Sequence, residues 1–175
     1  MTRIQCHMVS AVTLSVIFVV LPTVADAGTP QALDCWLQAE QNWVRDTSGP
    51  IVSLGEPGEF DDTHLFAPMV AAECGQYRLW YSGSTGRVAD RVFDLGLATS
   101  CDGRHFTKFS GNPVYQFGDG KHSVLTATLL RCGDGSTLRE HGHLRMWFSS
   151  TWFAGGSGKH TLHEAASYDG LHWSA

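Results

Sequence analysis

Residues 76–83 read QYRLWYSG, and the same pattern returns 67 positions later, where residues 143–150 read HLRMWFSS. The offset holds for a second, separate match between residues 98–106 (ATSCDGRHF) and residues 165–173 (AASYDGLHW). Two separated matches at one offset indicate an internal repeat. A repeat of this kind determines the architecture, so it is considered before individual helices or strands are assigned. Shorter matches at other offsets, where the loops differ in length, join Gly49-Pro50 to Asn112-Pro113 and Cys74-Gly75 to Cys132-Gly133.

Each copy of the repeat predicts four short strands, because runs rich in aromatic and apolar residues are separated by Gly-rich turns. The recurring Ser-x-Asp-Gly-x-His motif predicts a turn before the last strand, in which the Ser and Asp side chains bond to the backbone and Gly takes a positive φ. The predicted strands are residues 65–71, 77–82, 92–99 and from 106 in the first copy, and 124–131, 144–149, 161–167 and from 173 in the second.

Four antiparallel strands in a repeat of this size describe one blade of a β-propeller, so the expected fold class is all-β. We expect a partial propeller over residues 43–175, with blade one at about 43–105 and blade two at about 106–172. In the aromatic strand, Leu79 and Tyr81 share one face and Trp80 lies on the other. Apolar bulk on both faces is expected for a sheet packed between neighbours.

The N-terminus predicts a secretory signal peptide over residues 1–27. Arg3 precedes an apolar run at residues 8–21, which is shorter than the roughly 20 residues of a membrane-spanning helix. The Ala-Asp-Ala sequence at residues 25–27 fits a cleavage site. An uncleaved membrane anchor is the alternative. Cleavage would leave a secreted or periplasmic protein with no membrane segment, beginning with a lead-in segment over residues 28–42.

The composition excludes some functions and leaves others open. A net charge of -5 gives no basic face for nucleic acid, and it is compatible with neutral ligands. Export brings an oxidising compartment, in which the four cysteines of the mature chain could pair in three ways or stay reduced. The absence of a Cys-x-x-Cys pair argues against structural zinc, and no cofactor is expected. The cysteines are Cys35, Cys74, Cys101 and Cys132.

The order of motifs between Gly58 and Val114 resembles the five-bladed propeller glycosidases, the arabinanase, xylosidase, invertase and levansucrase-like group that includes glycoside hydrolase families 43 and 32. The resemblance covers residues 43–175. It implies carbohydrate, as oligo- or polysaccharide, as the ligand, and a ring of five blades, which at this repeat length needs about 335 residues. The chain would then represent two of the five blades. The Asp-Gly motif is also similar to the Asp-box of sialidase propellers, which makes sialidases a second family.

In the glycosidase group, the resemblance implies a catalytic carboxylate directly before the Pro of an Asp-Pro pair on the first inner strand, and a Glu acid from a later blade. That position holds Ala67, before Pro68, and a methyl group can neither activate water nor attack a sugar. Asp61 and Asp62, which lead into this strand, are the remaining catalytic candidates, with turn formation as their alternative role. We therefore expect no glycoside hydrolysis by this chain alone, and its status as an enzyme stays open.

Polar and aromatic side chains at the expected funnel mouth are candidates for sugar binding, namely His64, His122, Ser123 and Trp152. Trp80 and Trp147 occupy equivalent blade positions, so we expect them to pack between sheets rather than to stack on sugars. No metal site is expected, because the remaining histidines would lie on a solvated hairpin rim. These are His141, His143, His160 and His163.

Three functional hypotheses follow. The first is an exported glycosidase-like protein that binds or hydrolyses carbohydrate. The second is a non-catalytic carbohydrate-binding module that closes its ring as a homo-oligomer through open blade edges. The third is a truncated gene product without activity of its own. Ala67 favours the second or third hypothesis over hydrolysis.

Overall fold

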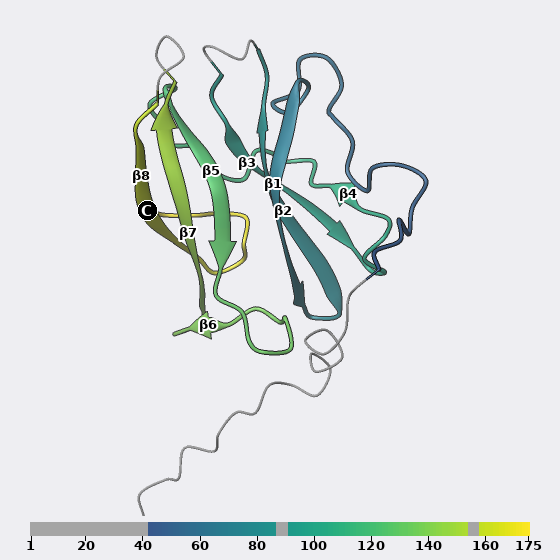
Figure 1. The fold of residues 1–175 in the computed structure, drawn as a ribbon. Coiled ribbons are helices and arrows are strands. Elements are labelled where there is room, and N and C mark those ends of the chain that lie inside the picture. The colour runs from purple at the N-terminus through teal and green to yellow at the C-terminus, as the bar shows by residue number, and fades with distance from the viewer. Residues whose placement is uncertain (1–41, 87–90, 154–157) are drawn as a thin grey trace, which may run out of the picture. The chain divides into compact units, whose positions relative to one another are not determined.

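The computed structural model describes residues 42–86, 91–153 and 158–175 (Figure 1). These residues belong to one compact unit. Their regular secondary structure consists of β-strands, which confirms the all-β prediction. Among them, no helix has the length and apolar character needed to cross a bilayer. The expected signal peptide, the lead-in segment up to residue 41, and Cys35 lie outside the described residues.

The first sheet contains the four strands predicted for blade one. It is antiparallel, and its strands lie in chain order. They are β1 (His64–Glu73), β2 (Gln76–Ser84), β3 (Asp94–Ser100) and β4 (Thr107–Lys108).

The second sheet repeats this plan around a central strand. That strand, β7 (His143–Trp152), pairs antiparallel with β5 (His122–Leu129) on one side and with β8 (His160–Ser167) on the other. A short strand that the repeat did not predict, β6 (Arg139–Glu140), pairs with the start of β7. An isolated bridge joins residues 166 and 174, and it corresponds to the pair formed by residues 99 and 107 in the first sheet. The second sheet therefore reaches its fourth strand at the predicted place.

The core that joins the two blades lies between the sheets. Trp80 is fully buried there, and its indole Nε1 donates to the Gly170 carbonyl at 3.0 Å. Backbone and side-chain bonds also cross between the sheets, for example from Val124 N to Phe93 O at 2.7 Å. Trp80 therefore packs between blades, as predicted. The buried members of this core are Met69, Ala71, Trp80, Leu95, Leu97, Val124, Leu129, Leu144, Met146, Phe148 and Ala165.

The outer face of the first sheet is covered by other parts of the chain, whereas the outer face of the second sheet is exposed. Leu79 and Tyr81 on the first sheet are buried beneath the chain that precedes β1, with Val52 and Phe60 among their contacts. In the second sheet, Leu162 occupies the repeat position of the buried Leu95 and is 85% exposed. Trp147 on the same face is only partly buried, and the Arg145 guanidinium lies 5.0 Å from its ring centre. The same strand pattern thus makes one covered outer face and one uncovered face.

Both edge strands that begin a blade contain a β-bulge at the same point of the repeat. The register of β1 shifts between residues 66 and 69, and that of β5 shifts between residues 125 and 128. Ala67 and Thr126 lie inside these shifts with φ of 52° and 48°. L-residues rarely adopt this conformation, and bulges commonly redirect side chains beside binding sites.

The predicted Asp-Gly turns are confirmed. In the first copy, Ser100 Oγ accepts from Gly103 N at 2.9 Å, while Asp102 Oδ1 accepts from the backbone N of residues 104 and 105. The bond from the His105 backbone N is the leading cause that holds the Asp102 pKa well below its ordinary value. Residues 167–172 repeat these bonds. A third turn of the same design, Asp119 to His122, lies outside the repeat.

The described cysteines, Cys74, Cys101 and Cys132, are exposed free thiols. No disulfide joins any two of these three cysteines. The sequence left both pairing and the reduced state open, and in this structure the three are reduced.

Candidate functional site

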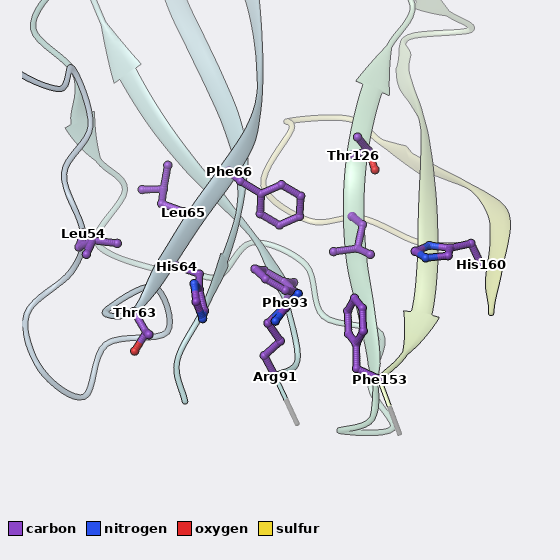
Figure 2. A pocket seen from close by; sticks show the side chains of 11 residues that line it. Leu54, Thr63, His64, Leu65, Phe66, Arg91, Phe93, Thr126, Phe153 and His160 are labelled. Carbon is purple, nitrogen blue, oxygen red and sulfur yellow. The ribbon is translucent and has the colours of Figure 1, made fainter. Parts of the chain in front are cut away.

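A pocket of about 600 Å³ lies where the first strands of the two blades, β1 and β5, come together (Figure 2). Its walls come from both blades and from the loops at the start of β3 and β8. The lining residues are Leu54, Thr63, His64, Leu65, Phe66, Arg91, Phe93, Leu125, Thr126, Phe153 and His160.

Aromatic rings and one guanidinium form the floor of this pocket. Phe93 makes edge contacts with Phe66 at 4.7 Å and with Phe153 at 6.3 Å between ring centres. The Arg91 guanidinium lies 5.4 Å from the Phe93 ring centre and 4.8 Å from that of Phe153. These contacts join the two blades, because Phe93 precedes β3 whereas Phe153 follows β7. Rings held in this way offer faces and edges on which a sugar can stack.

Polar side chains surround the rings (Figure 2). His64 opens β1, and its ring centre lies 6.0 Å from that of Phe93. His160 opens β8, and its Nδ1 lies at hydrogen-bond distance, 3.3 Å, from Ser149 Oγ. Thr126 is presented by the bulge of β5, and it is exposed. The pocket can therefore combine ring stacking with several hydrogen bonds.

Carboxylates are missing from the lining among the residues that the structure describes. Ala67 lies at the bulge of β1, the position that Thr126 occupies at the bulge of β5, and neither residue carries a carboxylate. Glycoside hydrolysis commonly needs two carboxyl groups, about 5 to 9.5 Å apart across the scissile bond. The described part of the pocket supplies neither group.

The predicted catalytic candidates separate in the structure. Asp61 is 1% exposed, so the expectation that it projects into the funnel is wrong. Its carboxylate accepts from the Tyr81 hydroxyl at 2.9 Å and pairs with Lys108 Nζ at 2.7 Å, on the covered outer face of blade one. Burial is the main cause that raises the Tyr81 pKa, and the Asp61 carboxylate adds to it. Asp61 therefore belongs to a buried polar cluster away from the pocket.

Asp62 forms a turn, which was the alternative to its predicted catalytic role. One carboxylate oxygen accepts from Gly58 N at 2.8 Å and the other accepts from Thr63 Oγ1 at 2.8 Å. The bond from Gly58 is the leading cause that lowers the Asp62 pKa. Asp62 does not line the pocket, although its neighbour Thr63 does.

The predicted sugar-binding residues lie in different parts of the structure. His64 lines the pocket. Ser123 is fully buried and its Oγ accepts from Phe93 N at 3.0 Å, so its expected place on an exposed rim is wrong. His122 and Trp152 lie outside the pocket, with 6.3 Å between their ring centres. Trp152 is 50% exposed and carries Lys121 Nζ 5.4 Å from its ring centre, so it offers a separate accessible ring.

The histidines considered as metal ligands do not gather. Leu144 pairs with Ser167, whereas Thr151 pairs with His160, so His143 and His160 lie near opposite ends of the β7–β8 hairpin. A separation of about seven strand residues corresponds to roughly 23 Å. Among the described residues, no group of three or more His, Cys, Asp or Glu side chains is placed to hold a metal ion.

Sequence reasoning missed Arg91, Phe93 and His160 as pocket residues. Phe93 and His160 occupy equivalent positions, 67 residues apart, at the start of the third strand of each blade. The two copies carry different side chains at this position, the buried Phe93 and the exposed His160, and this difference was an available signal.

No protein family model and no curated protein sequence matches this chain. Solved structures do match. One match comes from the GH130 family of mannoside phosphorylases, which contains glycoside hydrolases that target β-1,2 mannosidic linkages in Candida mannan. It is 16% identical to this chain, with a TM-score of 0.52, and the alignment covers 78% of this chain and 42% of the matched chain.

Two other matches have similar coverage. A glycoside hydrolase is 18% identical with a TM-score of 0.52 over 73% of this chain and 37% of its own. A glycosyl hydrolase from Bacteroides ovatus is 18% identical with a TM-score of 0.44 over 66% and 31%. The chain thus spans between about a third and two fifths of the length of these proteins. The two higher-scoring matches show that its sheets have the fold of propeller blades.

Proposed function

We propose that this chain is an exported, glycosidase-like propeller protein that binds oligo- or polysaccharide in the pocket between β1 and β5, and does not cleave glycosidic bonds by itself. The five-bladed glycosidase superfamily supplies the expected plan, in which the described residues account for two blades. Secretion or transfer to the periplasm rests on the predicted signal peptide, and mass spectrometry of the exported protein, with an N-terminus at Gly28, tests it.

One observation carries the binding proposal. The pocket combines the rings of Phe66, Phe93 and Phe153 with the polar groups of His64 and Thr126, and no carboxylate lines it among the described residues. Ligand sites of this size are mostly apolar with a few placed polar groups, whereas hydrolysis of a glycoside needs an acid and a base. The pocket therefore supports recognition better than it supports hydrolysis.

Affinity electrophoresis through gels that contain polysaccharides, run beside an assay for released reducing sugar, tests the proposal on the full chain. β-1,2-Linked mannan enters the panel first, because the GH130 structure is described with that linkage. We expect retardation by at least one polysaccharide without release of sugar. Sugar release that is lost in Asp61→Ala or Asp62→Ala would contradict the non-catalytic part, and retardation by none of a broad panel would contradict the binding part.

A matched pair of variants tests whether carbohydrate binds at this pocket. Phe153→Ala removes a ring that contacts Phe93 and Arg91, and we expect a loss of affinity of about 10-fold, the usual range for one stacking contact. Tyr168→Ala is the control, since Tyr168 is 67% exposed near the end of β8 that lies away from His160. Equal losses in both variants would show that the pocket is not the binding site.

The uncovered face of the second sheet favours a second candidate, a non-catalytic module that functions as a homo-oligomer. Leu162 and Trp147 stand at the positions of Leu95 and Trp80, which are buried in blade one. The same face of a second copy is the proposed partner, because a two-fold contact of this face with itself would bury Leu162 and Trp147 of both copies. Sedimentation of the wild-type chain and of Leu162→Asp tests this: a dimer abolished by the variant supports it, and a wild-type monomer at all concentrations rejects it.

A further inference from the structure

A second pocket, of about 370 Å³, lies beside the segment that leads into β3. Side chains of an extended segment point alternately to opposite faces. Arg91 and Phe93 line the pocket between β1 and β5. Val92 and Asp94, which alternate with them, line the second pocket, which we call the Asp94 pocket. Among the described residues, the two pockets share no lining side chain, so the Asp94 pocket can act as a site of its own.

Backbone pairing holds two polar side chains of the Asp94 pocket together. Leu95 N donates to Tyr115 O at 2.9 Å in an antiparallel bridge, and this bridge lies next to Asp94 and Gln116 on the two segments. Gln116 Nε2 donates to Asp94 Oδ2 at 2.9 Å. Asp94 is partly buried, and burial is the leading cause that raises its pKa. A carboxylate has about four acceptor positions, so Asp94 can accept further hydrogen bonds from a ligand.

An imidazole adds another acceptor to this pocket. His122 opens β5, and its Nδ1 is bonded to the Asp119 carboxylate. The bond from the His122 backbone N is the leading cause that holds the Asp119 pKa well below its ordinary value. An ionised carboxylate only accepts, so Nδ1 donates, and Nε2 of the neutral ring is an acceptor. The Phe117 ring, whose centre lies 5.1 Å from that of His122, provides apolar surface in the same pocket.

An accessible aromatic ring and open backbone lie next to these acceptors. Trp152 pairs with His122 in the register of β5 and β7, and it is 50% exposed, so its ring is available for stacking on a sugar. Gly118 and Gly120 line the pocket with φ of 88° and 65°, and without side chains they let a ligand approach the backbone. Stacking surface and hydrogen-bonding groups therefore occur together.

We propose that the Asp94 pocket is a second carbohydrate site and that it selects a neutral sugar. This rests on the proposed function and adds a site to it. The pocket offers acceptor atoms of Asp94, Gln116 and His122, and the hydroxyls of a neutral sugar are donors that match them. A sugar carboxylate or sulfate only accepts hydrogen bonds, and the Asp94 carboxylate would repel it.

Nuclear magnetic resonance titration of the full chain with disaccharides tests this inference. The reporter is the side-chain amide of Gln116, identified by its loss in Gln116→Ala. The probes are β-1,2-mannobiose and cellobiose, each beside its counterpart with the primary alcohols oxidised to carboxylates. We expect at least one neutral disaccharide to shift the reporter, and to bind about 10-fold or more tightly than its oxidised counterpart.

Matched variants assign the binding to Asp94. Asp94→Asn keeps the shape and an acceptor for Gln116 but removes the charge, and we expect about 10-fold weaker binding at the reporter. Asp46→Asn is the control for the same chemical change, because Asp46 pairs with Arg104 on the surface and does not line the pocket. Circular dichroism checks folding. If Asp94→Asn does not fold, calorimetry on Gln116→Ala, at an exposed position, gives the same comparison.

The outcomes separate this inference from the proposed function. An unshifted reporter, equal affinity for neutral and oxidised disaccharides, or equal effects of Asp94→Asn and Asp46→Asn would overturn the inference. Polysaccharide binding that depends on Phe153 would then still support the proposed function. A shifted reporter together with polysaccharide binding that Phe153→Ala leaves unchanged would support the Asp94 pocket and reject the pocket between β1 and β5.

Discussion

Trp80 and Trp147 occupy the same position in consecutive blades, yet only Trp80 is covered by a neighbouring blade. Replacing each with Ala therefore measures how much stability comes from blade packing. The repeat makes the pair a matched experiment, since the two residues have equivalent positions in their strands, similar flanking residues and the same change in size.

The expected costs differ because the surroundings differ. Trp80 is fully buried, its Nε1 donates to Gly170 O at 3.0 Å, and its ring makes an edge contact with Trp173 at 6.4 Å. Truncation of a buried Trp costs about 3–5 kcal/mol through lost burial and the remaining cavity. Since Gly170 O also accepts from Trp173 Nε1 at 3.1 Å, loss of the Trp80 bond adds little, and we expect about 4 kcal/mol. For the partly exposed Trp147, we expect about 1 kcal/mol.

Urea unfolding, followed by far-ultraviolet circular dichroism at equal protein concentration, gives both free energies of unfolding. If Trp80→Ala does not fold, Trp80→Phe and Trp147→Phe give the same ordering with smaller changes. Equal costs for the two positions would refute the reasoning, because they would mean that the two faces are covered to the same extent. A Trp147 cost that rises with protein concentration would instead indicate that another copy covers this face.

Further predictions concern the buried cluster and the Asp-Gly turns. Asp61→Asn should destabilise the chain by about 2–3 kcal/mol, which is at the low end for a broken buried ion pair because Lys108 is partly exposed. The folded fraction should keep its affinity for glycan. Lost glycan binding at unchanged stability would contradict this prediction. Turn carboxylates whose pKa is depressed in the folded state contribute stability above the unfolded pKa of about 3.9, and this contribution is lost as the pH falls. The urea midpoint should therefore drop below about pH 5, and less so in variants with Asn at these carboxylates; an equal drop in variant and wild type would argue against their role. The turn carboxylates are Asp102, Asp119 and Asp169.

The strands and their order could be predicted from the sequence because strand patterns are local. Alternation with period two and recurring turn motifs fall within a few residues, and most of them recur in the second copy of the repeat. The same reasoning succeeded at Trp80, which packs between the blades, but not at Trp147, which is only partly buried because no described segment covers its face.

The side chains of the pocket were harder to predict, because their directions depend on bulges. A single extra residue in a strand moves every later side chain to the other face, and although Pro68 marks the bulge at Ala67, no Gly or Pro marks the one at Thr126. His64 lines the pocket from the start of β1, and its predicted role in sugar binding stays a prediction. Asp61, just before β1, and Ser123, within β5, were misplaced, since short polar side chains also bond readily to buried partners.

The sequence by itself determined the repeat, the strands of each blade and the turns between them, since these follow from backbone preferences over short distances. The tertiary structure decided which side chains share the pocket. Arg91 and Phe93 meet Phe153 only because the two blades pack on each other, and the packing of segments far apart in the chain depends on the whole fold rather than on any local pattern. It also decided that Trp80 is covered while Trp147, its copy in the repeat, remains partly exposed, since burial depends on the neighbour that a face meets.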